Sequence, residues 1–139
     1  MTRVLIAAGG LLMVWSSACS PSSRDIPETI EMRGERVAVT ELRGVVDALC
    51  EAQEAAGRDF GQARMVFFDR AHNPLHDIAA AVGEIDRSSA ARLLEAKQAV
   101  EADFERMAGP ELASDLGGLV AETRDALDGL SVSVPGCDD

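Results

Sequence analysis

Apolar side chains return every three or four residues along most of the chain after residue 40, which is the spacing of helices that bury one face. The first such stretch predicts a helix over residues 41–56, with Thr40 as its N-cap and Gly57 at its end. Its apolar face consists of Leu42, Val45, Val46, Leu49 and Cys50.

A second helical stretch covers residues 60–85 and carries both histidines of the chain, with a proline between them. Asp59 and Gln62 have the spacing of a capping box at its start. A residue before proline is disfavoured in the α region, so the helix should stop at Asn73, which then caps a new helix that begins with Pro74. Two helical pieces joined at a bend and one long kinked helix both fit this pattern.

Two further apolar stripes follow. Asp86 with Ser88 and Ser89 marks the start of the third helix, Gly109 ends it, and Pro110 opens the fourth. The apolar face of the third helix contains Leu93, Ala96, Val100, Phe104 and Met107, and that of the fourth contains Leu112, Leu116, Leu119, Thr123, Leu127 and Leu130.

Four amphipathic helices with short connections predict an all-α fold, an antiparallel four-helix bundle with a kinked or split second helix. Alternating runs around Val37 and Val132 are too short to carry a sheet. Gly117 and Gly118 weaken the fourth helix by about 1 kcal/mol each, and their small size lets a neighbouring helix approach closely.

The first 18 residues have the layout of a secretory signal peptide. Arg3 gives a basic start, an apolar run of Val4 to Trp15 follows, and small residues precede Cys19. This arrangement resembles the signal of bacterial lipoproteins, although Ser16 stands where an aliphatic residue is commoner. The resemblance implies that Cys19 is lipidated with acyl chains such as palmitate and becomes the first mature residue. Cleavage by a general signal peptidase and an uncleaved anchor are the alternatives, and the shortness of the run disfavours the anchor.

This address divides the chain into a signal peptide (1–18), a lipidated cysteine with a flexible Pro/Ser-rich tether (19–33) and a helical domain (34–139). The expected location is the extracytoplasmic face of the cell membrane, held there by the lipid anchor. Residues 1–18 contain one of the 13 Lys and Arg residues, so the mature chain has 12 against 24 Asp and Glu residues. Such an acidic protein repels nucleic acid, and no nucleic-acid partner is expected.

Cys50 and Cys137 are the two cysteines that remain besides Cys19. An even pair in an exported chain is most simply a disulfide, which would tie the C-terminal tail to the first helix. A metal-thiolate or redox role is the alternative, and the chain lacks a C-x-x-C spacing that would favour it.

The histidines carry the main candidate chemistry. His72 and His76 are four residues apart and Asp69 precedes His72 by three, so an unbroken helix would present two imidazoles and a carboxylate on one face to copper, zinc or iron. Glu101 from the third helix is a candidate further ligand, with Glu51 and Glu54 of the first helix also available. Pro74 argues against this geometry. Structural roles at helix ends and proton-linked switching are the alternative interpretations.

Lys97 interrupts the apolar face of the third helix and lies one turn before Glu101. A partly buried pair inside the bundle and an exposed surface pair are both consistent with the spacing.

The segment from residue 44 to about 107 resembles small helical lipoproteins of high-GC Gram-positive bacteria, on the stretches FFDRAHNPLHDIA and AARLLEAKQAVEADFERM. The resemblance implies a fold and an address and transfers no functional residue. No nucleophile–base set, phosphate loop or three-ligand metal motif is visible, so an enzyme is not expected. Two hypotheses remain: an envelope lipoprotein that binds a transition metal, and a structural or interaction lipoprotein that docks an envelope protein and has no ligand of its own.

Overall fold

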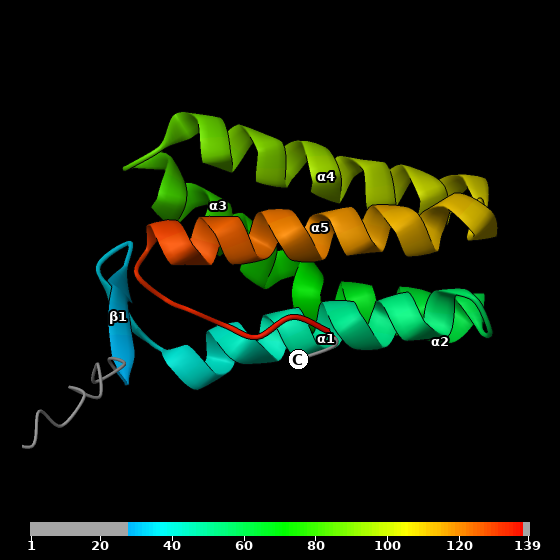
Figure 1. Cartoon of the computed structure of the whole chain (residues 1–139), viewed down its shortest axis with the longest axis horizontal. Coiled ribbons are helices and arrows are strands. Elements are labelled where there is room, and N and C mark those ends of the chain that lie inside the picture. Colours follow the sequence, from blue (N-terminus) through cyan, green and yellow to red (C-terminus); the bar gives the residue numbers. More distant parts are fainter. Residues whose placement is uncertain (1–27, 138–139) are drawn as a thin grey trace, which may run out of the picture.

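The computed structural model describes residues 28–137, and helices account for 75% of them (Figure 1). The elements in chain order are β1 (Thr29–Met32), β2 (Glu35–Ala38), α1 (Val39–Ala56), α2 (Phe60–Val66), the π-helical turn η1 (Phe67–Ala71), α3 (His72–Gly83), α4 (Arg87–Arg106) and α5 (Gly109–Gly129). The helical class expected from the sequence is therefore confirmed in its coarse form, with a two-stranded sheet added to it. The predicted signal peptide and the predicted lipidation site Cys19 lie outside the described residues.

The long helices pack around one core. In Figure 1, α5 crosses the middle of the molecule, with α4 on one side and α1 on the other, and it contacts both. Helix α3 packs against α4, and α2 packs against α1. Each large side chain that is fully withdrawn from water contributes roughly 1.5–3 kcal/mol of transfer free energy. The largest of these are Phe67, Leu49, Leu75, Ile78, Leu93, Leu112, Leu116, Leu119 and Leu127.

A β-hairpin replaces the last residues of the expected tether. Strands β1 and β2 pair antiparallel, with Met32 opposite Glu35. Both residues of the connecting turn have positive φ, 52° at Arg33 and 81° at Gly34, as a tight two-residue hairpin requires. Met32 is only 4% exposed and joins the core. The expectation that residues 28–33 lack regular structure and that no sheet forms is thus wrong, because core burial of Met32 and the Arg-Gly turn stabilise a short pairing.

Strand β2 runs directly into α1, which changes the expected start of that helix. Helix α1 begins at Val39, and its N-cap is Ala38 in extended conformation, without a side-chain hydrogen bond. The Val39 amide donates instead to the Glu28 carbonyl at 2.9 Å. Thr40 therefore lies inside the helix and does not cap it, since the hairpin already satisfies the first amide. The expected end at Gly57 is confirmed.

The break in the second helical stretch lies upstream of the predicted position. Asp59 caps α2 by accepting from the Gln62 amide at 2.9 Å, as expected. The helix then widens into η1, where the His72 amide donates to the Phe67 carbonyl. Proline lacks an amide hydrogen and its ring crowds the carbonyl four residues earlier. The π-helical turn accommodates that local demand, so Pro74 becomes the third residue of α3 and Asn73 is not its cap.

The remaining helix ends agree with the sequence in outline. Asp86 caps α4 by accepting from the Ser88 and Ser89 amides. Helix α4 stops at a left-handed residue, Met107, which is earlier than the predicted end at Gly109. No helix within residues 28–137 has both the length and the apolar character that crossing a membrane would require.

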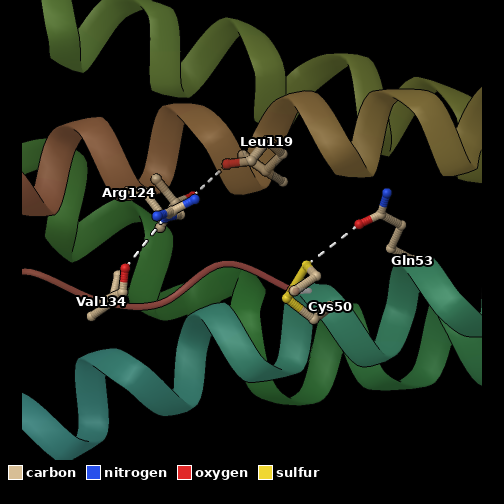
Figure 2. Close-up of a disulfide and its surroundings, with 7 residues drawn as sticks. Cys50, Gln53, Leu119, Arg124 and Val134 are labelled. Atoms are coloured by element: carbon tan, nitrogen blue, oxygen red, sulfur yellow. Dashed lines mark hydrogen bonds between the residues drawn. A yellow bond between two sulfur atoms is a disulfide. The ribbon is translucent and has the colours of Figure 1, made fainter. Parts of the chain in front are cut away.

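The predicted disulfide between Cys50 and Cys137 is confirmed and fixes the C-terminal tail along the helices (Figure 2). The tail carries Val132 and Val134, which are 0% and 5% exposed. Arg124 of α5 donates from Nε to the Val134 carbonyl at 3.3 Å. Residues 131–137 therefore form part of the core cover although they are not helical.

Candidate functional site

Both histidines lie on α3, one turn apart, because the helix is unbroken between them. The ring centroids of His72 and His76 are 5.2 Å apart, and the rings meet edge to face at 80°. The objection raised by Pro74 is removed, since the irregularity sits in η1, before His72. The two imidazoles therefore share one helix face, as the four-residue spacing predicts for an unbroken helix.

Glu101 reaches this face from the neighbouring helix α4. Its Oε1 is 2.7 Å from His72 Nε2 and 2.6 Å from Lys97 Nζ. The Lys97 side chain is 3% exposed, whereas those of Glu101 and His72 are 27% and 26% exposed. The Lys97–Glu101 pair is therefore partly buried, as one of the two alternatives predicted, and it is not an exposed surface pair. A buried ammonium group that loses its partner costs several kcal/mol. Lys97, Glu101 and His72 therefore form one hydrogen-bonded polar unit.

The charge state of Glu101 follows from its neighbours. Burial raises the pKa of the Glu101 carboxyl, but the hydrogen bond and positive charge of Lys97, followed by those of His72, lower it further, so the net pKa lies below its usual value. The carboxylate is therefore ionised at neutral pH. An ionised carboxylate accepts hydrogen bonds only, so His72 Nε2 carries the proton that it donates to Glu101.

The other nitrogen of His72 faces a side chain that sequence reasoning did not single out. His72 Nδ1 is 3.1 Å from Asn73 Oδ1. In a neutral His72 ring that is protonated at Nε2, Nδ1 is a hydrogen-bond acceptor. If the amide of the exposed Asn73 is turned so that its nitrogen and oxygen exchange places, its NH₂ group faces Nδ1 and donates to it. Position 73, predicted to cap a helix, instead contacts the imidazole.

Aromatic rings pack against the His72 side chain. The Phe68 ring is 5.3 Å from the His72 ring and 5.6 Å from that of Phe104, and Phe67 lies 5.3 Å from Phe104. The Arg64 guanidinium covers the Phe68 ring at 4.9 Å. Phe67 and Phe68 therefore limit the space available to the His72 ring. Helical spacing gave each phenylalanine an apolar face, but it did not show that rings from two helices meet under His72.

The other predicted ligands do not join the histidines. Asp69 is exposed and makes no hydrogen bond or ion pair with another described residue. Glu51 pairs with Arg70, and Glu54 pairs with Arg58. Within residues 28–137, no three His, Cys, Asp or Glu side chains are placed around a common metal position. The structure thus places His76 beside His72, and His72 beside the Glu101 carboxylate, which already has a lysine partner.

A groove lies beside the hairpin, and the sequence did not predict it. Its cavity of about 290 Å³ lies between the hairpin and α3, lined by Met32, Val37 and Asp77 among others. Arg33 crosses it to Asp77 at 3.1 Å. Both ends of that pair are well exposed, so the ion pair adds little stability.

Comparison of the chain with protein-family models, with curated proteins and with solved structures finds no match.

Proposed function

We propose that this chain is a non-enzymatic lipoprotein of the cell envelope, anchored through Cys19, which binds a transition metal at His72 and His76. The observation that carries the proposal is the 5.2 Å separation of the two rings on one unbroken helical turn. Imidazoles at i and i+4 of a helix chelate copper, zinc or iron, with water completing the coordination. Because nothing else in the described chain adds a ligand, we expect weaker binding than in a closed structural site.

Glu101 fits an orienting role better than the ligand role predicted from the sequence. It accepts the Nε2 proton of His72 at 2.7 Å and is held by Lys97 on the same oxygen. A carboxylate on one ring nitrogen fixes the tautomer and makes the other nitrogen a better metal ligand. The metal would then use Nδ1 of His72, with Asn73 turning aside, and Lys97 would keep its partner.

The expected address agrees with the disulfide. A Cys50–Cys137 bond persists in an oxidising compartment and is rare in a reducing cytosol. The acidic mature chain also suits a cation ligand more than an anion ligand. We further infer that the packing of α1, α4, α5 and the continuous α2–η1–α3 stretch is that of an antiparallel four-helix bundle with a kinked second helix.

A second candidate function is a structural or interaction lipoprotein that docks an envelope protein and has no ligand. The saturated Lys97–Glu101–His72 unit favours it, because a buried polar unit with internal partners needs no metal. In that case His76 is simply an exposed residue.

Thermal unfolding of the chain from Ser20 onward, with copper(II), zinc(II) or iron(II) added, separates the two. Binding to the folded state raises the unfolding midpoint by mass action. The chain has only two histidines, so the double variant His72→Ala/His76→Ala removes every imidazole. Asp77→Asn, next to His76 and on the same helix, is the matched control and should keep the metal shift. A shift that survives the double substitution would place the metal elsewhere and overturn the His72/His76 site, whereas the absence of any shift in the parent chain would favour the second function.

A further inference from the structure

Two acidic residues, Asp103 and Asp115, lie close together across α4 and α5 near the turn that joins these helices, and Asp115 is only partly buried. Asp103 of α4 is 0% exposed. Its Oδ1 accepts from Arg106 Nη2 at 2.7 Å, but its Oδ2 has no hydrogen-bond donor. The carboxyl group of Asp115 on α5 lies within hydrogen-bonding reach of Asp103. A fully buried carboxylate oxygen without a hydrogen-bond donor destabilises the folded state. The protonation state of the neighbouring Asp115 therefore determines whether Asp103 Oδ2 has a donor.

Two ionised carboxylates cannot hydrogen-bond to each other, whereas a carboxylic acid donates to a carboxylate. We propose that Asp115 carries a proton that it donates to the orphan Oδ2 of Asp103, so that the two residues form an acid-stabilised link across the α4–α5 turn. The link supplies the donor that Asp103 lacks and removes one of the two negative charges. It is independent of any metal at the histidines.

The charges around the pair agree with this assignment. Burial raises the pKa of Asp115, and the hydrogen bond and charge of Asp103 raise it further, while Arg106 opposes them and Glu111 adds to them. Helix α1 faces this part of α5 with the uncharged Gln53, which lies beside Gly117. The nearby Glu54 of α1 is already paired with Arg58.

The turn between α4 and α5 contains a strained residue, so a link across it should affect the stability of the turn. Met107 ends α4 with φ of 53°, a left-handed conformation that is strained for a residue other than glycine. Its side chain is 77% exposed, so burial does not offset that strain. The Asp103–Asp115 link, together with apolar contacts of α4 with α5, holds the two helix ends at this turn. Loss of the shared proton should therefore loosen the turn as pH rises.

The sign of the effect follows from linkage. A carboxyl whose pKa is higher in the folded state contributes stability that is complete at acid pH and is lost as pH rises through the folded pKa. The side-chain amide of the Asp115→Asn variant also donates a hydrogen bond, but this group does not titrate, so the hydrogen bond is independent of pH. Asp115→Asn should therefore have an unfolding midpoint close to that of the parent chain near about pH 4, and a higher midpoint near about pH 7.5.

Two measurements in chelator-treated buffer test the link. Carbon-13 NMR of the Asp115 carboxyl should give a titration midpoint above that of an ordinary aspartate, and the midpoint difference between Asp115→Asn and parent should grow with pH. Asp125→Asn, an exposed change on the same helix, is the control and should show no such growth. Asp115 titrating at or below the ordinary value, or a midpoint difference independent of pH, overturns the proposal. So does calcium or magnesium ion that raises the midpoint of the parent but not of Asp115→Asn, because the pair would then hold a cation.

Discussion

Lys97 Nζ donates to Glu101 Oε1 at 2.6 Å from a side chain that is 3% exposed. A lysine on the inner face of α4 is tolerated only because its ammonium group has this partner. No other hydrogen bond or ion pair is made by the Lys97 ammonium among the described residues. The pair is therefore the place where a single conservative substitution should be most damaging.

Glu101→Gln should destabilise the domain by about 3 kcal/mol, because it leaves the buried ammonium without a counter-charge. Glu54→Gln is the matched control, since Glu54 and Arg58 form an i,i+4 pair whose side chains are 72% and 70% exposed. That control should lose only about 0.5 kcal/mol or less. Urea unfolding at neutral pH measures both. Equal losses from the two substitutions would mean that Lys97 finds water and is not isolated.

The stability due to Glu101 should depend on pH. Its pKa is lowered in the folded state by Lys97 and His72, which outweigh burial, so its contribution is present above the unfolded pKa and disappears as pH falls through the folded pKa. The difference in unfolding free energy between the parent and Glu101→Gln should therefore shrink on acidification. Urea unfolding across a pH series measures it. A difference that stays constant down to about pH 3, below the ordinary Glu value, would contradict the assignment.

The disulfide should be the largest single contribution outside the core. It joins residues 87 apart, and in the chain-entropy model a loop of this size is worth roughly 4–5 kcal/mol. The double variant Cys50→Ala/Cys137→Ala should lose about that amount in urea unfolding, while a reductant should destabilise the parent and leave the variant unchanged. Gln53 Oε1 lies 3.5 Å from Cys137 Sγ, but a disulfide sulfur has no proton to donate, so we expect Gln53→Ala to cost far less (Figure 2).

Helical periodicity predicted the helices well because burial of one face follows spacing alone. The caps at Asp59 and Asp86 were also predictable, since a side-chain acceptor next to free amides is a local signal. The hairpin was missed because its stability comes from Met32 reaching a core made by distant helices. Its Arg33-Gly34 turn also lacks the usual Asn or Asp that favours positive φ.

The candidate site was predictable in its members but not in its geometry. Spacing placed His72 and His76 one turn apart, yet proline rules placed a break between them that the structure moves into η1. Spacing also related Lys97 to Glu101 without showing whether the pair is partly buried or exposed. The burial of the pair depends on how α4 packs against α3 and α5, and these contacts join residues far apart in the sequence. Asp103 and Asp115 were overlooked because an acidic residue at a helical position normally indicates a solvated face.

The adjacent glycines of α5 offer a test of packing against helix propensity. A Cβ at Gly118 would meet nothing within 4 Å, whereas one at Gly117 would lie 2.9 Å from Gln53 Nε2 of α1. Gly118→Ala should therefore gain about 0.8–1 kcal/mol from the helix preference of alanine. Gly117→Ala has the same intrinsic gain, but Gln53 must move aside, so its net gain should be smaller or absent. Thermal unfolding of the two single variants measures the difference, and each serves as the other's control. A lower midpoint for Gly117→Ala than for Gly118→Ala would be due to the close approach of α1 to α5 at Gly117. Combining Gly117→Ala with Gln53→Ala should then restore the stability gained from alanine. Equal stabilities of the two single variants would mean that Gln53 yields without cost.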